Sequence, residues 1–370
     1  MPPAVSKCTD VQTNLGDGPL TDIEYTTEAA EIERLELLLS SPSDELVSMM
    51  GRLRGDILIL GAGGKIGPSI SRMAKRASDQ AGTPRRIIAA SRFSRLEAKS
   101  RLEASGVETI AIDLLDAQQL ESLPDVKNVI YLAGFKFGSW GQPSLTWAVN
   151  SYVPGLVMER FRNSRIVAFS TGCVYGLSKV AMAGAIESDR LQPSDEYSMS
   201  CLGRERIIEH FSRENKTQAA LLRLNYAVEL RYGVLVDIAK MVYTGQTIDL
   251  TMGHVNVIWQ GDANAMAICA LEKTSSPPLV LNLVGPELLS IRRVAELFGE
   301  IFNKPVHFDG TESSTCFLSN GQLCHQMFGY PHVPVRRIIE WTAEWITESR
   351  TTNNQPTCFQ ERNGNFKGSP

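Results

Sequence analysis

The stretch DILILGAGGKIGPSISRMAKRA, residues 56–77, decides the fold of this chain. An apolar run leads into a loop containing Gly61, Gly64 and Gly67, and apolar residues then recur at helical spacing. Glycine permits a tight turn and lets a pyrophosphate approach the backbone amides, while the N-terminus of the following helix supplies partial positive charge. Glycines at this spacing between a strand and a helix predict a dinucleotide-binding element, and the alternative is a tight turn without a ligand.

Further short apolar runs follow this element and alternate with longer helical segments. Parallel strands buried on both faces appear as continuous apolar runs, and a helix between consecutive runs is what a parallel pair requires. The pattern therefore predicts an α/β fold with a Rossmann-like, doubly wound parallel sheet. The predicted strands are residues 56–60, 86–90, 108–112, 128–133, 165–169, 219–224 and 279–284.

The other segments are arranged around this sheet. Residues 1–52 are predicted as an N-terminal arm (1–25) followed by packing helices, one over 26–39 and one starting at Ser43. Residues 53–225, with the later strand near 279–284, form the predicted NAD(P)-binding domain. Residues 226–350 form most of a small C-terminal substrate lobe, and 351–370 a loosely held polar tail. In that lobe the spacing predicts a helix over 291–302 with one apolar face, made of Ile291, Val294, Ala295, Phe298, Ile301 and Phe302.

Composition excludes several classes of protein. Hydrophobic residues make up 43% and charged residues 21% of the 370, which excludes a largely disordered chain. The formal net charge of -4 argues against a nucleic-acid partner, and no apolar stretch approaches the ~20 residues that cross a bilayer. With no apolar signal segment and seven scattered cysteines, we expect reduced thiols and a cytoplasmic location. Cys316, Cys324 and His325 cluster in sequence, but zinc usually takes four ligands at paired spacings, so we predict no metal site.

The end of the second strand bears on the choice of cofactor. An Asp or Glu there would bind the ribose hydroxyls of NAD, whereas an arginine can bind the 2′-phosphate of NADP with a bidentate fork. The strand ends in AASRFSR, with Ser91, Arg92 and Arg95 and no carboxylate before Glu97. NADP is therefore favoured over NAD, and the alternative is that Arg92 is a solvated loop residue. Lys65, inside the glycine loop, either adds a cation near phosphate or faces water.

From about Asp56 to about Phe302 the chain resembles the extended short-chain dehydrogenase/reductase family, also called the NAD-dependent epimerase/dehydratase family. GAGGKIG is similar to the family's GxxGxxG loop, VIYLAG (129–134) to its strand and turn beside the cofactor, and FSTGCVYG (169–176) to its catalytic Ser/Thr loop. Arg223 and Asn225 resemble its R-x-N motif, so they either meet a phosphate or carboxylate of the substrate or brace the lobe. The cofactor-binding residues that the glycine loop, the second strand and the resemblance together imply are Gly61, Gly64, Lys65, Ile66, Gly67, Ser91, Arg92, Asp113, Leu114, Ala133, Gly134 and Asn150.

The resemblance also implies that Thr171 and Tyr197 are catalytic, and it places Cys201 where the family's Tyr-x-x-x-Lys signature has lysine. In the family the tyrosine exchanges a proton with the substrate while hydride moves, and the lysine favours the phenolate; each pKa unit is worth about 1.4 kcal/mol. A neutral thiol supplies no such charge, so the role of Cys201 is either that of a reactive thiol or, as we expect, of a small apolar filler. Arg204 could replace the lysine by folding back, but we expect Arg204 and Glu205 to form a surface pair.

Two functions remain open. The first is an enzyme, an NAD(P)-dependent oxidoreductase, epimerase or dehydratase that acts on a sugar or nucleotide-sugar-like substrate. The second is a catalytically impaired dinucleotide-binding protein with a regulatory or scaffold role, favoured by the missing lysine. The implied partners are a dinucleotide and a small sugar-like molecule, with neither nucleic acid nor membrane. Because the family commonly dimerises through the helix that carries the tyrosine, a homodimer is a further expectation.

Overall fold

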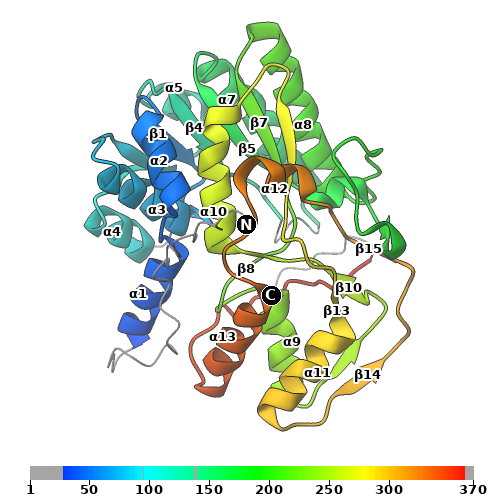
Figure 1. Ribbon diagram of the computed structural model, residues 1–370. Coiled ribbons are helices and arrows are strands. Elements are labelled where there is room, and N and C mark those ends of the chain that lie inside the picture. Colours follow the sequence, from blue (N-terminus) through cyan, green and yellow to red (C-terminus); the bar gives the residue numbers. More distant parts are fainter. Residues whose placement is uncertain (1–27, 95, 137–138, 140, 363–370) are drawn as a thin grey trace, which may run out of the picture.

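A seven-stranded parallel sheet forms the centre of the protein (Figure 1). The computed structural model describes residues 28–94, 96–136, 139 and 141–362, and the predicted arm over 1–25 lies outside them. The strand order is β12-β7-β5-β4-β1-β2-β3. All seven predicted apolar runs are strands of this sheet, which confirms the doubly wound α/β fold. Their bounds are β1 Ile57–Leu60, β2 Ile87–Ser91, β3 Glu108–Ala111, β4 Asn128–Tyr131, β5 Arg165–Thr171, β7 Ala219–Leu224 and β12 Leu279–Leu283.

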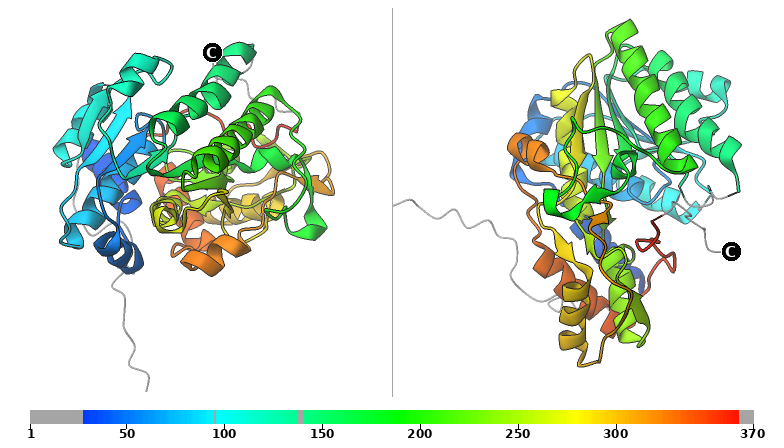
Figure 2. Two further views of the ribbon diagram at one scale, coloured as in Figure 1. Left: turned by 90° about the horizontal axis from the view of Figure 1, so that it is seen from above. Right: turned by 90° about the vertical axis from the view of Figure 1, so that its right-hand side faces the viewer.

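Alternate side chains of the strands enter two separate cores. On β1, Ile57 and Ile59 pack with one set of helices, and Leu58 and Leu60 pack with the other. All four are fully buried, and each contributes about 2 kcal/mol relative to exposure. Figure 2 shows the two helical layers from the side and from above. The first layer contains α2 Asp44–Arg52, α3 Gly67–Gln80 and α10 Gln260–Cys269, with α4 Leu96–Ala104 at its edge and η5 Ala270–Lys273 after α10. The second layer contains α5 Ala117–Glu121, α7 Val153–Arg160 and α8 Glu196–Asn215, and α6 Pro143–Trp147 and η2 Ala148–Tyr152 pack against α8.

A second lobe lies beyond the carboxyl ends of the strands, at the bottom of Figure 1. Its core joins side chains of α1, α9, α11 and α13. The helix predicted over 291–302 is confirmed, but Ile301 is 46% exposed, so its assignment to the apolar face was wrong. The helices of this lobe are α1 Glu28–Leu39, α9 Val234–Tyr243, α11 Ile291–Phe302 and α13 Val335–Thr347. Helix α12 Gln322–Phe328 packs instead against β12, with Cys324 in the first core of the sheet domain. The two-stranded ladders are β14 His307–Asp309 with β9 Thr247–Asp249, β10 His254–Val255 with β13 Leu289–Ser290, β11 Ile258–Trp259 with β8 Ala227–Val228 and β15 Thr315–Cys316 with β6 Ser178–Lys179, and the short helices η3 Gly172–Tyr175 and η4 Val180–Met182 follow β5 and β6.

The N-terminal helices connect the two parts. The predicted cap of the second helix is confirmed, because the Leu46 amide donates to the Ser43 side chain at 3.3 Å. Helix α1 makes an ion pair from Glu33 to Arg72 of α3 at 2.6 Å and another from Glu36 to Arg231 at 2.8 Å. Because its partners lie in both parts, α1 braces the lobe against the sheet domain.

The C-terminal tail is packed on the protein as far as residue 362, so the expectation of a loosely held tail was wrong for this segment. Thr357 and Phe359 are each 3% exposed, and Phe359 belongs to the core of the second lobe. The Arg362 guanidinium donates to the carbonyls of Thr251 and Thr315 at 3.0 and 2.8 Å. These contacts fix a polar stretch whose sequence carries no periodic pattern.

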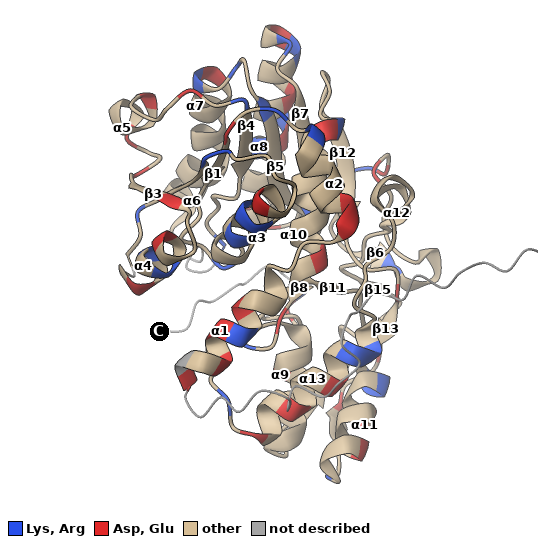
Figure 3. Ribbon diagram, turned by 60° about the vertical axis from the view of Figure 1, so that its left-hand side comes forward, with Lys and Arg blue, Asp and Glu red and all other residues tan. Residues whose placement is uncertain are grey.

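Two features that the composition drew attention to are the surface charge, in which neither sign dominates, and the Cys/His cluster. Basic and acidic residues are interspersed over the outer helices of both parts (Figure 3). None of the helices within the described ranges is both long and apolar enough for a membrane span. Cys324 contacts the Met266 sulfur at 3.9 Å and His325 hydrogen-bonds the Val284 carbonyl at 2.9 Å. Among the described residues, no group of three or more His, Cys, Asp or Glu side chains is placed to hold a metal ion.

Candidate functional site

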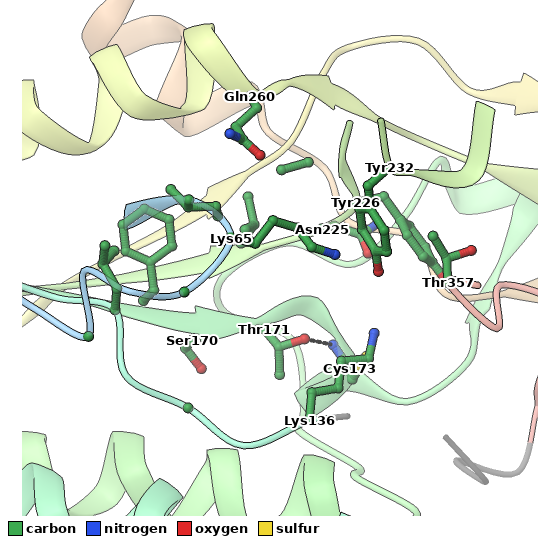
Figure 4. Close-up of a pocket in the computed structure, with 18 of the residues that line it drawn as sticks. Lys65, Lys136, Ser170, Thr171, Cys173, Asn225, Tyr226, Tyr232, Gln260 and Thr357 are labelled. Carbon is green, nitrogen blue, oxygen red and sulfur yellow. Dashed lines mark hydrogen bonds between the residues drawn. The ribbon is translucent and has the colours of Figure 1, made fainter. Parts of the chain in front are cut away.

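Two adjoining cavities lie at the carboxyl ends of the strands, the larger of about 440 Å³ and the smaller of about 290 Å³. Both are lined by Gly61, Gly64 and Gly134, so the glycine loop and the turn after β4 form their common wall. The larger cavity extends from this wall to the second lobe, as the close-up in Figure 4 shows. In doubly wound sheets, ligands bind at this edge.

The glycine loop is shaped by close backbone approaches. Gly61 has φ +84°, and a Cβ there would lie 2.6 Å from the Ala133 amide nitrogen. A Cβ on Gly67 would lie 2.1 Å from the Ala62 carbonyl oxygen. Gly64 meets only the Gly61 carbonyl oxygen, at 3.3 Å, so its far side is open to the cavities. Helix α3 starts at Gly67 without a side-chain cap, which leaves amides of its first turn for an acceptor, so this loop fits a bound pyrophosphate.

The smaller cavity is lined by residues that were predicted to select between NAD and NADP and to bind the adenosine end of the dinucleotide. Ser91, Arg92, Asp113 and Leu114 all line it. The Arg92 side chain is exposed, and the Asp113 carboxylate accepts the Leu115 amide at 3.0 Å. Apolar walls come from Leu145, Val149 and Val153. Arg95 lies outside the described residues.

Lys65 lines the larger cavity, which disfavours the alternative that it faces water. Its amine lies over the ring of Tyr232, which lines the same cavity. Burial lowers the pKa of Lys65 to about 6, and the positive charge of Lys136 lowers it further, while Glu229 and Asp237 oppose the shift.

Thr171 and Tyr197 meet at the larger cavity. Thr171 ends β5, and its hydroxyl accepts the Cys173 amide at 3.2 Å, as Figure 4 shows. Tyr197 is in the first turn of α8, which starts with a capping box between Asp195 and Ser198. Burial raises the pKa of Tyr197 well above its ordinary value, Cys201 and Cys173 add to the increase, and Arg204 and a hydrogen bond with Thr171 oppose it. The phenol is therefore protonated at neutral pH.

Cys201 lies one turn further along α8 and is 1% exposed. It packs in a small apolar cluster with Val174, Tyr175 and Ala185. Burial raises its pKa to about 11, so it is a neutral thiol at physiological pH. These surroundings support the apolar-filler interpretation, since a reactive thiol needs a lowered pKa.

Arg204 is the largest departure from the sequence-based expectation. The predicted surface pair is wrong, because Arg204 and Glu205 are 5% and 3% exposed. The Arg204 guanidinium lines the larger cavity and donates to the Phe169 carbonyl at 2.7 Å and to the Asn150 side-chain oxygen at 2.8 Å. Asn150 is in turn fixed by the Phe135 amide at 2.8 Å, within the π-helical segment η2. Asn150 thus positions Arg204 and the turn after β4.

Glu205, the next residue of α8, forms a buried network of hydrogen bonds and an ion pair with side chains of the sheet and of η3. It pairs with Arg223 at 2.7 Å and accepts the Ser170 hydroxyl at 2.6 Å. Arg223 also donates to the Tyr175 hydroxyl at 2.7 Å. Burial opposes the charge of Arg223, but the hydrogen bond and charge of Glu205 outweigh it and raise its pKa. Arg223 is 4% exposed and is not among the described residues that line the two cavities, which favours the bracing alternative; Asn225 does line the larger one.

Several lining residues were not anticipated from the sequence. Lys136 lies two residues after Gly134 of the Ala133-Gly134 turn, so its place along the chain was a usable signal. Gln355 and Thr357 come from the C-terminal tail, and nothing local in the sequence connects them to the site. The others are Tyr226, Tyr232 and Gln260, all labelled in Figure 4 with Lys136 and Thr357.

Comparison with known proteins supports the fold independently. Residues 57–228 match the model of the NAD dependent epimerase/dehydratase family. The structure is similar to UDP-glucose 4-epimerase from Thermotoga maritima, solved with UDP-glucose, at 17% identity and a TM-score of 0.65, over 80% of this chain and 99% of that one. It is also similar to dTDP-glucose 4,6-dehydratase from Streptomyces venezuelae, solved with NAD, at 17% identity and a TM-score of 0.67, over 80% and 98% of the two chains. No curated protein matches the sequence significantly.

Proposed function

We propose that this protein binds NAD(P) across the two cavities and catalyses oxidation or reduction at a hydroxyl or carbonyl carbon of a sugar-like substrate. One observation carries the proposal: Thr171, Tyr197 and Arg204 converge on the same cavity as the open side of the glycine loop. The family match over 57–228 and the nucleotide-sugar enzymes that share the fold are consistent with this class of reaction.

Each implied part of the dinucleotide has matching residues. The glycine-loop amides and the start of α3 suit the pyrophosphate, Asp113 and Leu114 suit the adenine, and the turn at Ala133 and Gly134 suits the nicotinamide side. Bound nicotinamide would accept or return a hydride. We propose that NADP binds better than NAD, since Arg92 lines the adenosine cavity at the end of β2 and can meet a 2′-phosphate.

Tyr197 and Thr171 would transfer and orient the proton. With its raised pKa the phenol is a hydrogen-bond donor and acid at neutral pH, which suits protonation of a substrate oxygen. In the opposite direction the phenol must ionise, and a nearby cation makes this easier. Arg204 supplies that cation, because its charge lowers the pKa of Tyr197 and Cys201 supplies none.

The alternative is a dinucleotide-binding regulatory or scaffold protein with impaired catalysis. It is favoured by the neutral Cys201 thiol and by the strongly raised Tyr197 pKa, which both disfavour the phenolate. Assembly as a homodimer and a cytoplasmic location stay predictions under either function.

Calorimetric titration with NAD, NADH, NADP and NADPH tests dinucleotide binding, and dinucleotide-coupled oxidation of a panel of sugars and nucleotide sugars tests turnover. We expect binding with preference for the phosphorylated pair, and turnover that Tyr197→Phe lowers by at least about 10²-fold. Tyr330→Phe, at a tyrosine that is 68% exposed, is the matched control and should leave turnover unchanged. If none of the four dinucleotides binds, both functions are excluded; binding with no turnover even in a single-turnover experiment favours the alternative.

A further inference from the structure

The larger cavity carries charge of one sign. Lys136 and Arg204 line it as cations, Lys65, whose pKa burial lowers to about 6, lines it as a largely neutral amine at pH 7, and none of its lining residues in the described part of the chain is Asp or Glu. The Lys136 charge adds to the effect of burial on Lys65, while Glu229 and Asp237, which are not among the lining residues, oppose it. Cations that face each other in a partly enclosed space repel, and a ligand that brings negative charge relieves this repulsion.

Two of these basic residues lie where the dinucleotide would bind. Lys65 belongs to the glycine loop, and a Cβ on Gly134 would lie 3.0 Å from the Arg204 guanidinium. Lys136 lies further along the loop after β4. Its ammonium is 5.8 Å from the centre of the Tyr197 ring, and in Figure 4 it extends past Cys173 into the cavity, toward the side of Tyr226 and Thr357. Lys136 thus faces the part of the cavity that is left for a substrate.

The C-terminal tail forms one wall of this part of the cavity. Gln355 and Thr357 line it, and the amide and hydroxyl of Thr357 both donate to one Asp237 carboxylate oxygen, at 2.8 and 2.6 Å. On either side the tail is tied by the Asn353 amide, which donates to the Arg231 carbonyl at 3.0 Å, and by the buried Phe359. The tail is therefore a fixed wall of the cavity.

The cavity is partly open to solvent, and its free volume restricts what fits beside the dinucleotide. About 440 Å³ has to hold the nicotinamide end of the dinucleotide as well as the reacting molecule. A sugar linked to a nucleotide would bring a second base, a second ribose and a diphosphate, and where these groups extend past Lys136 they meet Gln355 and Thr357 (Figure 4).

We propose that the substrate is a compact, anionic, sugar-like molecule, of monosaccharide size, whose carboxylate or phosphate binds Lys136. This inference rests on the proposed function and narrows it: the charge of Lys136 selects the anion, the tail wall excludes nucleotide-linked sugars, and Thr171 with Tyr197 faces the reacting carbon.

The test uses the full chain loaded with the reduced dinucleotide that binds best, and follows the fluorescence of the bound nicotinamide. The probes are glucuronate, glucose 6-phosphate, glucose and UDP-glucose, which separate a carboxylate from a phosphate, an anion from a neutral sugar and a compact ligand from an extended one. We expect glucuronate or glucose 6-phosphate to bind at least tenfold more tightly than glucose and UDP-glucose.

Lys136→Gln identifies the residue responsible. A hydrogen bond to a charged group is strong enough that its loss should weaken binding of the preferred anion by roughly tenfold or more, with binding of glucose and of the dinucleotide unchanged. Lys179→Gln, at an exposed lysine of β6, is the matched control and should bind all probes like the wild type.

The outcomes separate the two proposals. A chain that binds no dinucleotide defeats the proposed function itself. A chain that binds dinucleotide, but binds glucose or UDP-glucose as tightly as the anions or binds none of the probes, overturns the anionic substrate alone. Equal weakening of every probe by Lys136→Gln also overturns it, because that result indicates a structural role for the lysine.

Discussion

Two buried arginines next to the site, Arg204 on α8 and Arg223 on β7, differ in what balances their charge. Arg223 is paired with Glu205 at 2.7 Å and hydrogen-bonded to Tyr175, so its charge is neutralised inside the fold. The Arg204 hydrogen bonds end on the Phe169 and Asn150 carbonyl oxygens and the Asn150 side-chain oxygen, at 2.7 to 3.2 Å. A closed ion pair serves the fold, whereas a buried cation that faces a cavity and is held by uncharged oxygens is placed for a ligand.

The largest effect that tests this difference between the two arginines is expected from removing the charge of Glu205. We expect Glu205→Gln to lower the free energy of unfolding by about 3–5 kcal/mol, since it leaves Arg223 as a buried charge without its partner. Urea denaturation followed by circular dichroism measures this. Glu209→Gln, which removes a surface carboxylate of the same helix, should stay within about 0.5 kcal/mol of the wild type. A Glu205→Gln protein as stable as the Glu209→Gln control would show that the pair does not hold the fold.

The converse prediction concerns Arg204. Arg204→Met should cost about 10²–10³-fold in turnover, as for the loss of a preorganised charge at a reacting oxygen, but only about 1–3 kcal/mol in the free energy of unfolding. Steady-state kinetics measures the turnover, and urea denaturation of the same preparations measures the free energy of unfolding.

Two further variants sharpen the interpretation of that result. Arg204→Lys should recover part of the turnover because it keeps the charge, while Arg206→Met removes an exposed arginine of the same helix and should change neither quantity. If Arg204→Met loses stability as heavily as Glu205→Gln and keeps its turnover, the two arginines have the same structural role and the comparison fails.

A smaller effect is expected from introducing at position 201 the lysine that the family resemblance implies. Cys201→Lys would place a long charged side chain in the apolar cluster around Val174 and Tyr175, next to Arg204. We expect no gain in turnover, because Arg204 already provides the charge, and a loss of about 1–3 kcal/mol in stability from overpacking. A large gain in turnover would show instead that the site of the natural protein is impaired, which is the alternative function.

The contrast between the arginines also explains which parts of the molecule could be predicted. Buried parallel strands need continuous apolar runs, so all seven strands were visible in the sequence, as was the glycine loop. The buried position of Arg204 left a weaker signal: residues 197, 201 and 204 are separated by four and three positions, the spacing that puts side chains on one helix face. Read alone, however, the pair Arg204-Glu205 has the composition of a solvated surface.

The tail could not be predicted by any local pattern. Thr357 and Gln355 reach the cavity through contacts with α9 and with the loop at Arg231, far away in sequence. Such contacts depend on the assembled lobe, and a polar segment without periodicity is equally typical of a mobile terminus. The same reason explains the wrong prediction for Ile301: the helical spacing was right, but the described residues leave this side chain 46% exposed.

The smallest predicted effect concerns the thiol of Cys201, at the position where the family resemblance implies a lysine. Burial raises the pKa of Cys201 from the ordinary 9.0 to about 11, so the folded protein favours its neutral form. Below pH 9 both states keep the proton and the thiol adds no pH dependence. From pH 9 to about 11 the unfolded chain releases its proton first, so this contribution to stability is lost as the pH rises. Urea denaturation at pH 8, 9 and 10 should therefore show a steeper decline for the wild type than for Cys201→Ala, by about 1 kcal/mol at pH 10. Parallel declines would mean that the thiol is ionised as easily in the fold as outside it, and Cys201 would then have to be counted among the charges that act on Tyr197.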